Sequence, residues 1–180
     1  MNPIERLLRR YGRERSGASA MEFALLAPVM LTLYFGTFEV TQGIAMDRLV
    51  KLNASTITNL VAQYTTISTS RDMPDLFAAT SKIMAPYPLA KPATVVSCIA
   101  IDDKGKATVA WSQASGGTAR TVGQTVTLPA ALDKPNTQLI LGETTMAYHP
   151  TIQFVPLGAW NLYGAVYMFP RASSVINLTS

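Results

Sequence analysis

The stretch ASAMEFALLAPVMLTLYFGTF, residues 18–38, decides the fold of the N-terminal part of this chain. Glu22 is the only charged residue among these 21, and Glu39 follows directly after them. As a helix the stretch would rise about 31 Å, close to the roughly 30 Å hydrocarbon core of a bilayer. It therefore predicts a single membrane-spanning helix.

A short basic leader, residues 1–17, precedes this stretch. It contains five arginines and two glutamates, so it supplies most of the net charge of +4 and gives no sign of a nucleic-acid-binding face. Basic flanks stay in the cytoplasm. We therefore expect a cytoplasmic leader (1–17), a transmembrane helix (18–38) and an extracytoplasmic domain (39–180) that includes the outer half of a long helix.

Helical periodicity continues beyond the span and predicts one long helix over residues 19–69. Pro28 lacks a backbone donor, so a kink is expected there, and Gly43 is a second expected bend. Apolar and threonine side chains recur every three or four positions and predict a stripe that docks on a sheet. The stripe consists of Leu49, Leu52, Thr56, Leu60, Tyr64 and Ile67, with Ile57 and Val61 beside it.

The rest of the chain predicts a second helix followed by strands. Pro74 suits the first turn of that helix, and Pro86 and Pro88 are expected to end it. An apolar β-branched run and then an alternating apolar pattern predict the first two strands, and further strands follow. These are expected at 93–101 and 107–111, which form a hairpin, and at 124–128, 137–148, 163–169 and 175–178. The fold class is α+β, with a four- to five-stranded antiparallel sheet packed on the long helix.

The sequence contains one cysteine, Cys98, and one histidine, His149. No intramolecular disulfide is possible, and a zinc site would need carboxylate ligands. Cys98 lies in an apolar run and is expected to be a small buried side chain, with an intermolecular disulfide as the alternative. No nucleophile motif or phosphate-binding loop is present, so we expect no cofactor and no enzymatic activity.

The segment RERSGASAMEFALLAP, residues 13–28, resembles the TadE-like minor pilins, or pseudopilins, of the bacterial tight-adherence pilus system. In that family a basic leader ends in glycine, and four small or apolar residues, a glutamate and an aromatic residue follow. Gly17 then matches the last leader residue, Ala18 the first mature residue, Glu22 the fifth and Phe23 the aromatic. The resemblance covers about residues 10–45 and implies a pilin-like fold.

The resemblance also implies processing and partners. A prepilin peptidase would cleave between Gly17 and Ala18, and the helix would contact the lipid bilayer, other pilins and pilus-assembly proteins. The protein would reside in the bacterial cytoplasmic membrane with its C-terminus outside. Cleavage creates an ammonium group on Ala18 one helical turn before Glu22, so Glu22 would pair with its own ammonium or a neighbour's and set the assembly register together with Phe23.

Two other interpretations stay open. Gly43-Ile44-Ala45 fits a small-x-small cleavage site, so an ordinary signal peptide is a rival to the pilin leader. The chain is alternatively an unprocessed, membrane-anchored binding module on the outer face of the membrane. The mature N-terminus distinguishes these possibilities, because only the pilin interpretation places it at Ala18.

Overall fold

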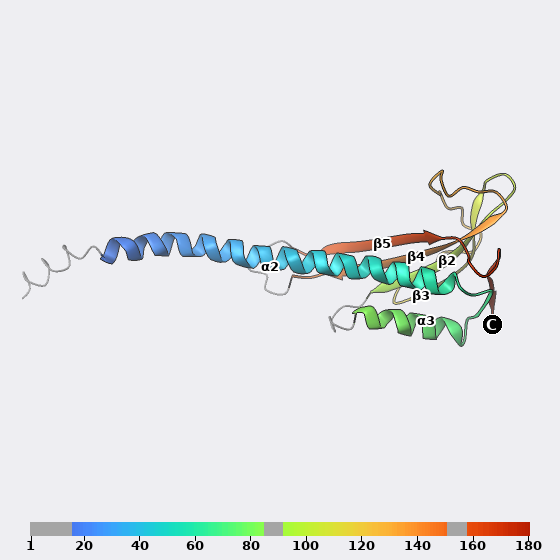
Figure 1. Cartoon of the computed structure of the whole chain (residues 1–180), viewed down its shortest axis with the longest axis horizontal. Coiled ribbons are helices and arrows are strands. Elements are labelled where there is room, and N and C mark those ends of the chain that lie inside the picture. Colours follow the sequence, from blue (N-terminus) through green and yellow to red (C-terminus); the bar gives the residue numbers. More distant parts are fainter. Residues whose placement is uncertain (1–15, 85–91, 151–157) are drawn as a thin grey trace, which may run out of the picture. The chain divides into compact units, whose positions relative to one another are not determined.

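The structure is a computed structural model that describes residues 16–84, 92–150 and 158–180 (Figure 1). The chain divides into two units, residues 1–42 with 150–157, and residues 43–149 with 158–180. Most of the expected leader lies outside the described residues, as do Pro86 and Pro88, which were expected to end the second helix.

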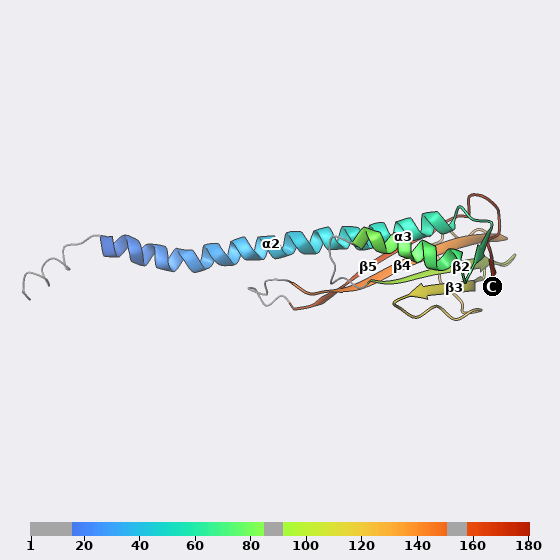
Figure 2. The ribbon, with the colours of Figure 1, turned by 90° about the horizontal axis from the view of Figure 1, so that it is seen from below.

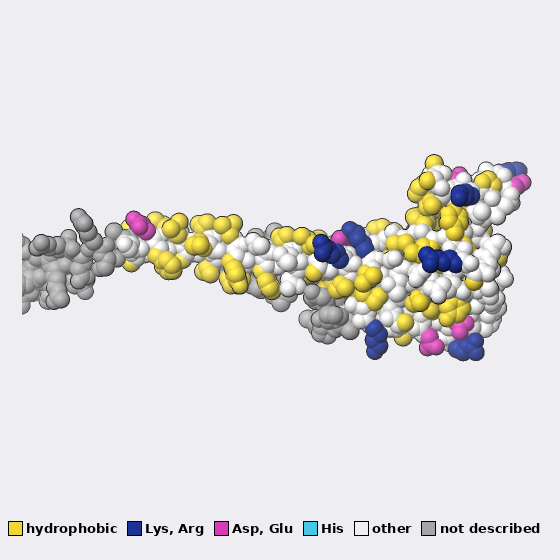
Figure 3. All heavy atoms as spheres, in the orientation of Figure 1, with side chains coloured by type: hydrophobic (Ala, Val, Ile, Leu, Met, Phe, Trp, Pro, Cys, Tyr) yellow, Lys and Arg dark blue, Asp and Glu magenta, His cyan; other side chains and the backbone are white. Residues whose placement is uncertain are grey.

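In the first unit the described residues other than Pro150 belong to one helix, α2 (Ser16–Val61), which continues into the second unit. It runs unbroken through Pro28. Figure 3 shows hydrophobic side chains exposed along this part of the helix. By length and composition α2 could cross a membrane, and a helix that is apolar on every side is typical of a membrane span. The large exposed side chains are Met21, Phe23, Leu25, Leu26, Val29, Met30, Leu31, Leu33, Tyr34, Phe38 and Val40.

Helix α2 ends at Val61, so the expected end at residue 69 is wrong. The last turn tightens, because Gln63 N donates to Leu60 O (3.2 Å) and Tyr64 N donates to Val61 O (3.1 Å). A β-branched run then begins at Thr65, and such residues favour extended backbone. Ile67, assigned to the helical stripe, is buried instead from a short strand, β1 (Thr66–Ser68).

The buried face of α2 in the second unit also differs from the predicted stripe. Leu52 is 51% exposed, whereas the polar side chains Asn53 and Thr58 are buried. The buried apolar residues of this face are Met46, Val50, Ala54, Ile57 and Val61. The predicted stripe was chosen for its large apolar residues. In the structure, small and polar side chains of α2 lie where the helix comes closest to the sheet.

A second helix, α3 (Asp72–Ser81), follows β1 and leads into a short 3-10 helix, η1 (Lys82–Met84). The Asp72 carboxylate accepts a hydrogen bond from Ser68 N (2.8 Å), which fixes the start of α3. Leu76 and Thr80 of α3 and Met84 of η1 are buried.

Four strands form the antiparallel sheet in the order β3-β2-β4-β5. They are β2 (Ala93–Ile101), β3 (Ala107–Ser115), β4 (Thr137–Tyr148) and β5 (Trp160–Met168). The predicted hairpin is β2 and β3, and its turn contains Gly105 at φ 79°, a left-handed conformation that favours glycine. Figure 2 shows α2 and α3 on the same side of this sheet. The α+β prediction is confirmed.

Two strand predictions need correction. Residues 124–128 form no strand, and only a single bridge joins Thr125 to Thr108 of β3. The last strand is β6 (Asn177–Thr179), and it pairs in parallel with β1 as a separate two-stranded sheet. The C-terminal strand is therefore held against the segment that directly follows α2.

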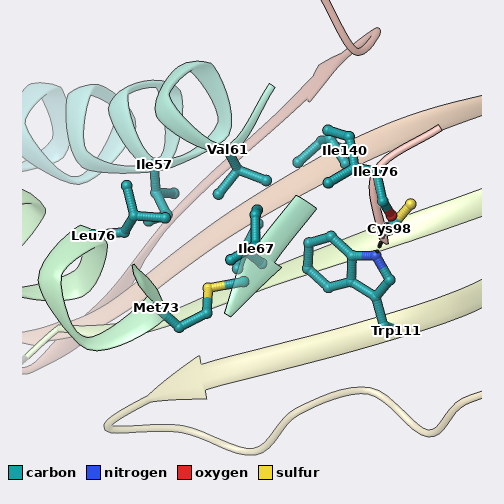
Figure 4. Packing of buried hydrophobic residues seen from close by; sticks show 10 residues of the cluster. Ile57, Val61, Ile67, Met73, Leu76, Cys98, Trp111, Ile140 and Ile176 are labelled. Carbon is teal, nitrogen blue, oxygen red and sulfur yellow. Dashed lines mark hydrogen bonds between the residues drawn. The ribbon is translucent and has the colours of Figure 1, made fainter. Parts of the chain in front are cut away.

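The space between the helices and the sheet contains two apolar clusters. The first is built around Ile57, Val61, Trp111 and Ile140, and Figure 4 shows Trp111 Nε1 bonded within it to the carbonyl of Ile176 (2.9 Å). The second consists of Met46, Val50, Met84, Met146, Tyr148 and Leu162. These clusters bury one stripe of α2 against one face of the sheet.

The opposite face of the sheet has its own apolar cluster, because successive strand residues point to opposite faces. Leu139 and Leu141 of β4 pack there with Ile99, and Val126 and Leu128 cover them from the connection between β3 and β4. This explains why the segment predicted as a strand at 124–128 is apolar: its side chains contribute to the core without extending the ladder.

Candidate functional site

The residues of the expected processing site lie in the first turn of α2. The helix begins at Ser16, so both Gly17 and Ala18 are helical. Gly17 is exposed, and a Cβ built on it would meet nothing within 4 Å. A larger side chain at Gly17 therefore has room among the described residues. A steric effect of such a change would act through another molecule that contacts this position.

Glu22 lies on the same helix, four residues after Ala18. Residues four apart on a helix are neighbours on one face, so the two positions lie one above the other. The Glu22 side chain is exposed, and it has no ion-pair partner among the described residues. An exposed carboxylate in an apolar helix surface can accept a cationic group from outside the helix.

Phe23 is 69% exposed and begins the apolar surface. Pro28 lies farther along the same surface and has no N–H to donate to Ala24 O. The Pro28 carbonyl accepts a bond from Thr32 Oγ1 (2.8 Å). The kink at Pro28 stays a prediction. This surface offers apolar contacts for lipid or for neighbouring helices, with Glu22 as its single charge between residues 18 and 38.

Glu39 has a property that the sequence did not indicate. Its side chain is 1% exposed, and neither carboxylate oxygen has a hydrogen-bond partner among the described residues. From the sequence, Glu39 marked only the end of the apolar stretch. Its position, four residues before Gly43 and seven before Met46, falls on the stripe of α2 that is buried farther along the helix, so this spacing is the signal that could have found it.

A partly buried ionic cluster lies in the second unit, on the sheet face away from α2. Arg120 donates to both carboxylate oxygens of Glu143, each at 2.8 Å, and Tyr163 Oη donates to Oε1 at 2.8 Å. Burial raises the pKa of Glu143, but the hydrogen bonds from Arg120 and Tyr163 outweigh it, so the net pKa is lowered. Burial, followed by the bond to Glu143, raises the pKa of Tyr163 to about 12.

Cys98 is fully buried on β2, which confirms the expectation of a small buried side chain. Burial raises the pKa of its thiol to about 12, and Sγ donates to Gln138 Oε1 (3.2 Å). In the part of the chain that the structure describes, no group of three or more His, Cys, Asp or Glu side chains is placed to hold a metal ion.

Together these features define a class of protein: a long apolar N-terminal helix, with a charge near its start, that continues into an antiparallel α+β unit. The family model of the TadE-like proteins matches residues 17–50. The match includes Gly17, Ala18, Glu22, Phe23 and Pro28, and it confirms the resemblance found in the sequence. No curated protein and no solved structure matches the chain.

Proposed function

We propose that this chain is a TadE-like minor pilin, or pseudopilin, that contributes to the assembly of a tight-adherence pilus. In this proposal a prepilin peptidase cleaves it after Gly17, and the protein has a structural and not a catalytic role. The observation that carries the proposal is the family match to residues 17–50, which coincides with the exposed apolar part of α2.

The proposed orientation places the leader in the cytoplasm and the C-terminus outside. Its support is the excess of arginine before the apolar stretch. The apolar part of α2 would lie in the bilayer before assembly, and its exposed side chains would contact the helices of other pilins and pilus-assembly proteins afterwards. In both settings the large exposed side chains would be removed from water.

Glu22 would act after cleavage. The new ammonium group on Ala18 would lie within one helical turn of the carboxylate, in the same chain or a neighbouring one. In an apolar environment, losing one partner of such a pair leaves the other charge unpaired, which costs more than losing a surface ion pair. The pair would therefore favour one register between helices over others.

The direct test is mass spectrometry of the membrane-extracted protein from a host with the cognate peptidase. We expect a mature N-terminus at Ala18. Gly17→Leu should leave the full-length chain, because the added side chain has room within α2 but not in a peptidase site fitted to glycine. The matched control is Gly12→Leu, a glycine change elsewhere in the leader, and it should leave cleavage intact.

The outcomes separate the alternatives. An intact Met1 in the wild-type protein would contradict processing and favour the unprocessed, membrane-anchored binding module. An N-terminus just after Ala45 would identify an ordinary signal peptide instead. Normal cleavage of Gly17→Leu would show that the assigned site is wrong.

The role of Glu22 needs a separate experiment. Glu22→Gln keeps the size of the side chain and removes its charge, so we expect efficient cleavage but a loss of surface pili. Glu14→Gln is the matched control, because cleavage removes Glu14 with the leader. An immunoblot reports size, and electron microscopy counts pili. Normal piliation with Glu22→Gln would contradict a role for the carboxylate in assembly.

A further inference from the structure

Three buried polar side chains meet where α2 packs on the sheet, and they are called here the polar layer: Asn53 of α2, Thr94 of β2 and Thr144 of β4. They are 1%, 4% and 0% exposed. Asn53 Nδ2 donates to Thr94 Oγ1 at 3.2 Å, and Thr94 is the register partner of Thr144. The layer thus contains residues of the helix and of two neighbouring strands, and its one direct side-chain bond among the described residues joins α2 to β2.

The polar layer separates the two apolar clusters beneath α2. Along the helix, Asn53 lies between Val50 of one cluster and Ile57 of the other. Along β4, Thr144 lies between Met146 and Ile140, which belong to the same two clusters. Polar groups in such a setting have no access to bulk solvent, so their hydrogen bonds must be made inside the protein.

Two atoms of the layer have no hydrogen-bond partner among the described residues: Asn53 Oδ1 and Thr144 Oγ1. Exchanging the oxygen and nitrogen of the Asn53 amide would not supply the missing hydrogen bond. One end of the amide would still face Thr94, and the other would still lack a partner. An unsatisfied buried group costs stability, and native proteins rarely retain two in one place.

The geometry suits a single bridging molecule. Side chains of directly paired residues in an antiparallel sheet have Cβ atoms about 4.5–5.5 Å apart. Asn53 is bonded to Thr94, so from this contact the Thr144 side chain is one cross-strand spacing away, a span that one small molecule can bridge. The two orphaned atoms are an amide oxygen, which accepts, and a hydroxyl, which both donates and accepts. All three side chains are neutral, which does not suit an ion.

We propose that one internal water molecule binds in the polar layer, donating to Asn53 Oδ1 and accepting from the Thr144 hydroxyl. Buried waters commonly satisfy such groups, at about one for every 27 residues of a globular protein. The bridge would hold α2 at one position along the sheet. A shift of the helix along its axis would bring Asn53 against an apolar cluster and break the bridge.

The proposal is tested by whether the substitution Thr144→Val lowers or raises the melting temperature. Thr144→Val keeps the shape of the side chain and removes the hydroxyl. With the water bound, the full-length protein in detergent micelles should lose about 2–4 °C in melting temperature, because a hydrogen bond is lost. If the hydroxyl is an unsatisfied group, valine should raise the melting temperature, and this result would overturn the proposal.

Water-selective NMR on the same sample distinguishes a bridging water from a direct bond. We expect magnetisation transfer from water to the Asn53 side-chain amide in the wild type and in Thr144→Ser, and its loss in Thr144→Val. The matched control is Thr80→Val, a threonine 1% exposed whose hydroxyl already donates to Phe77 O (3.1 Å). It should leave the transfer unchanged. No transfer in the wild type would mean that no long-lived water occupies the layer.

Discussion

Gly142 of β4 lies directly beneath Thr58 of α2, and the space between them is too small for any side chain at position 142. A Cβ on Gly142 would overlap Thr58 Oγ1 and would approach Ala54 O to 2.8 Å. The Thr58 hydroxyl is itself bonded to Ala54 O at 2.6 Å. This glycine therefore sets how closely the long helix approaches the sheet.

The first prediction follows from this contact. Gly142→Ala should destabilise the protein by about 1–3 kcal/mol, the usual cost of overpacking a tight core. Ala147→Val is the control on the same strand, because Ala147 is exposed on the opposite face and should change stability by less than about 0.5 kcal/mol. Denaturant unfolding in detergent measures both. An unchanged midpoint for Gly142→Ala would show that helix and sheet separate easily here.

The second prediction concerns the C-terminal segment. Ile176 is 1% exposed and packs in the cluster with Trp111, so Ile176→Ala should cost about 2–5 kcal/mol. Val175→Ala is a control at the adjacent residue, since Val175 is 43% exposed. If both variants unfold at the same denaturant concentration as the wild type, the C-terminal segment contributes nothing to the core.

The third prediction is a pH dependence from the Arg120–Glu143 pair. The pKa of Glu143 is lowered in the folded protein, so its contribution to stability is present above the ordinary glutamate value of 4.5 and is lost as the pH falls below it. Glu143→Gln should therefore be less stable than the wild type at neutral pH, and the difference should shrink as the pH falls. A constant difference across this range would contradict the ionic role.

The fourth prediction concerns Cys98. Burial raises the pKa of its thiol to about 12, so the thiolate that reacts with alkylating agents is scarce in the folded protein. We expect no adduct at pH 8 by mass spectrometry until the protein is unfolded. In Thr145→Cys, which adds a thiol at an exposed strand position, one adduct should form on the folded protein. Rapid labelling of Cys98 in the folded wild type would show that the core opens.

The fifth prediction tests the proposed orientation. A reporter enzyme that is active only outside the cytoplasm, fused after Ser180, should be active, because an excess of arginine before a span, as in residues 1–17, favours the cytoplasmic side for that end. Moving positive charge to the other side of the span should reduce this activity. An inactive reporter on a stably produced fusion would reverse the orientation.

The sequence by itself determined the features that depend on local composition and period. The apolar stretch at residues 18–38, with Glu22 near its start, predicted a membrane helix and pointed to the family. The strand-forming residues at 137–148 predicted β4 with the bounds found in the structure. The β4 prediction is confirmed, and α2 is long and apolar enough to cross a membrane, because a regular strand and an apolar helix leave their signal in adjacent residues.

The tertiary structure decided what depends on residues far apart in the chain. The burial of Ile67 from β1 depends on parallel pairing with β6, more than 100 residues later in the chain. Burial of Asn53 and Thr58, with Leu52 exposed, depends on Gly142 admitting the helix at close range. A periodicity argument ranks residues by their own hydrophobicity. Burial depends instead on the shape of the surface against which a helix packs, and a single sequence does not show which surface that is.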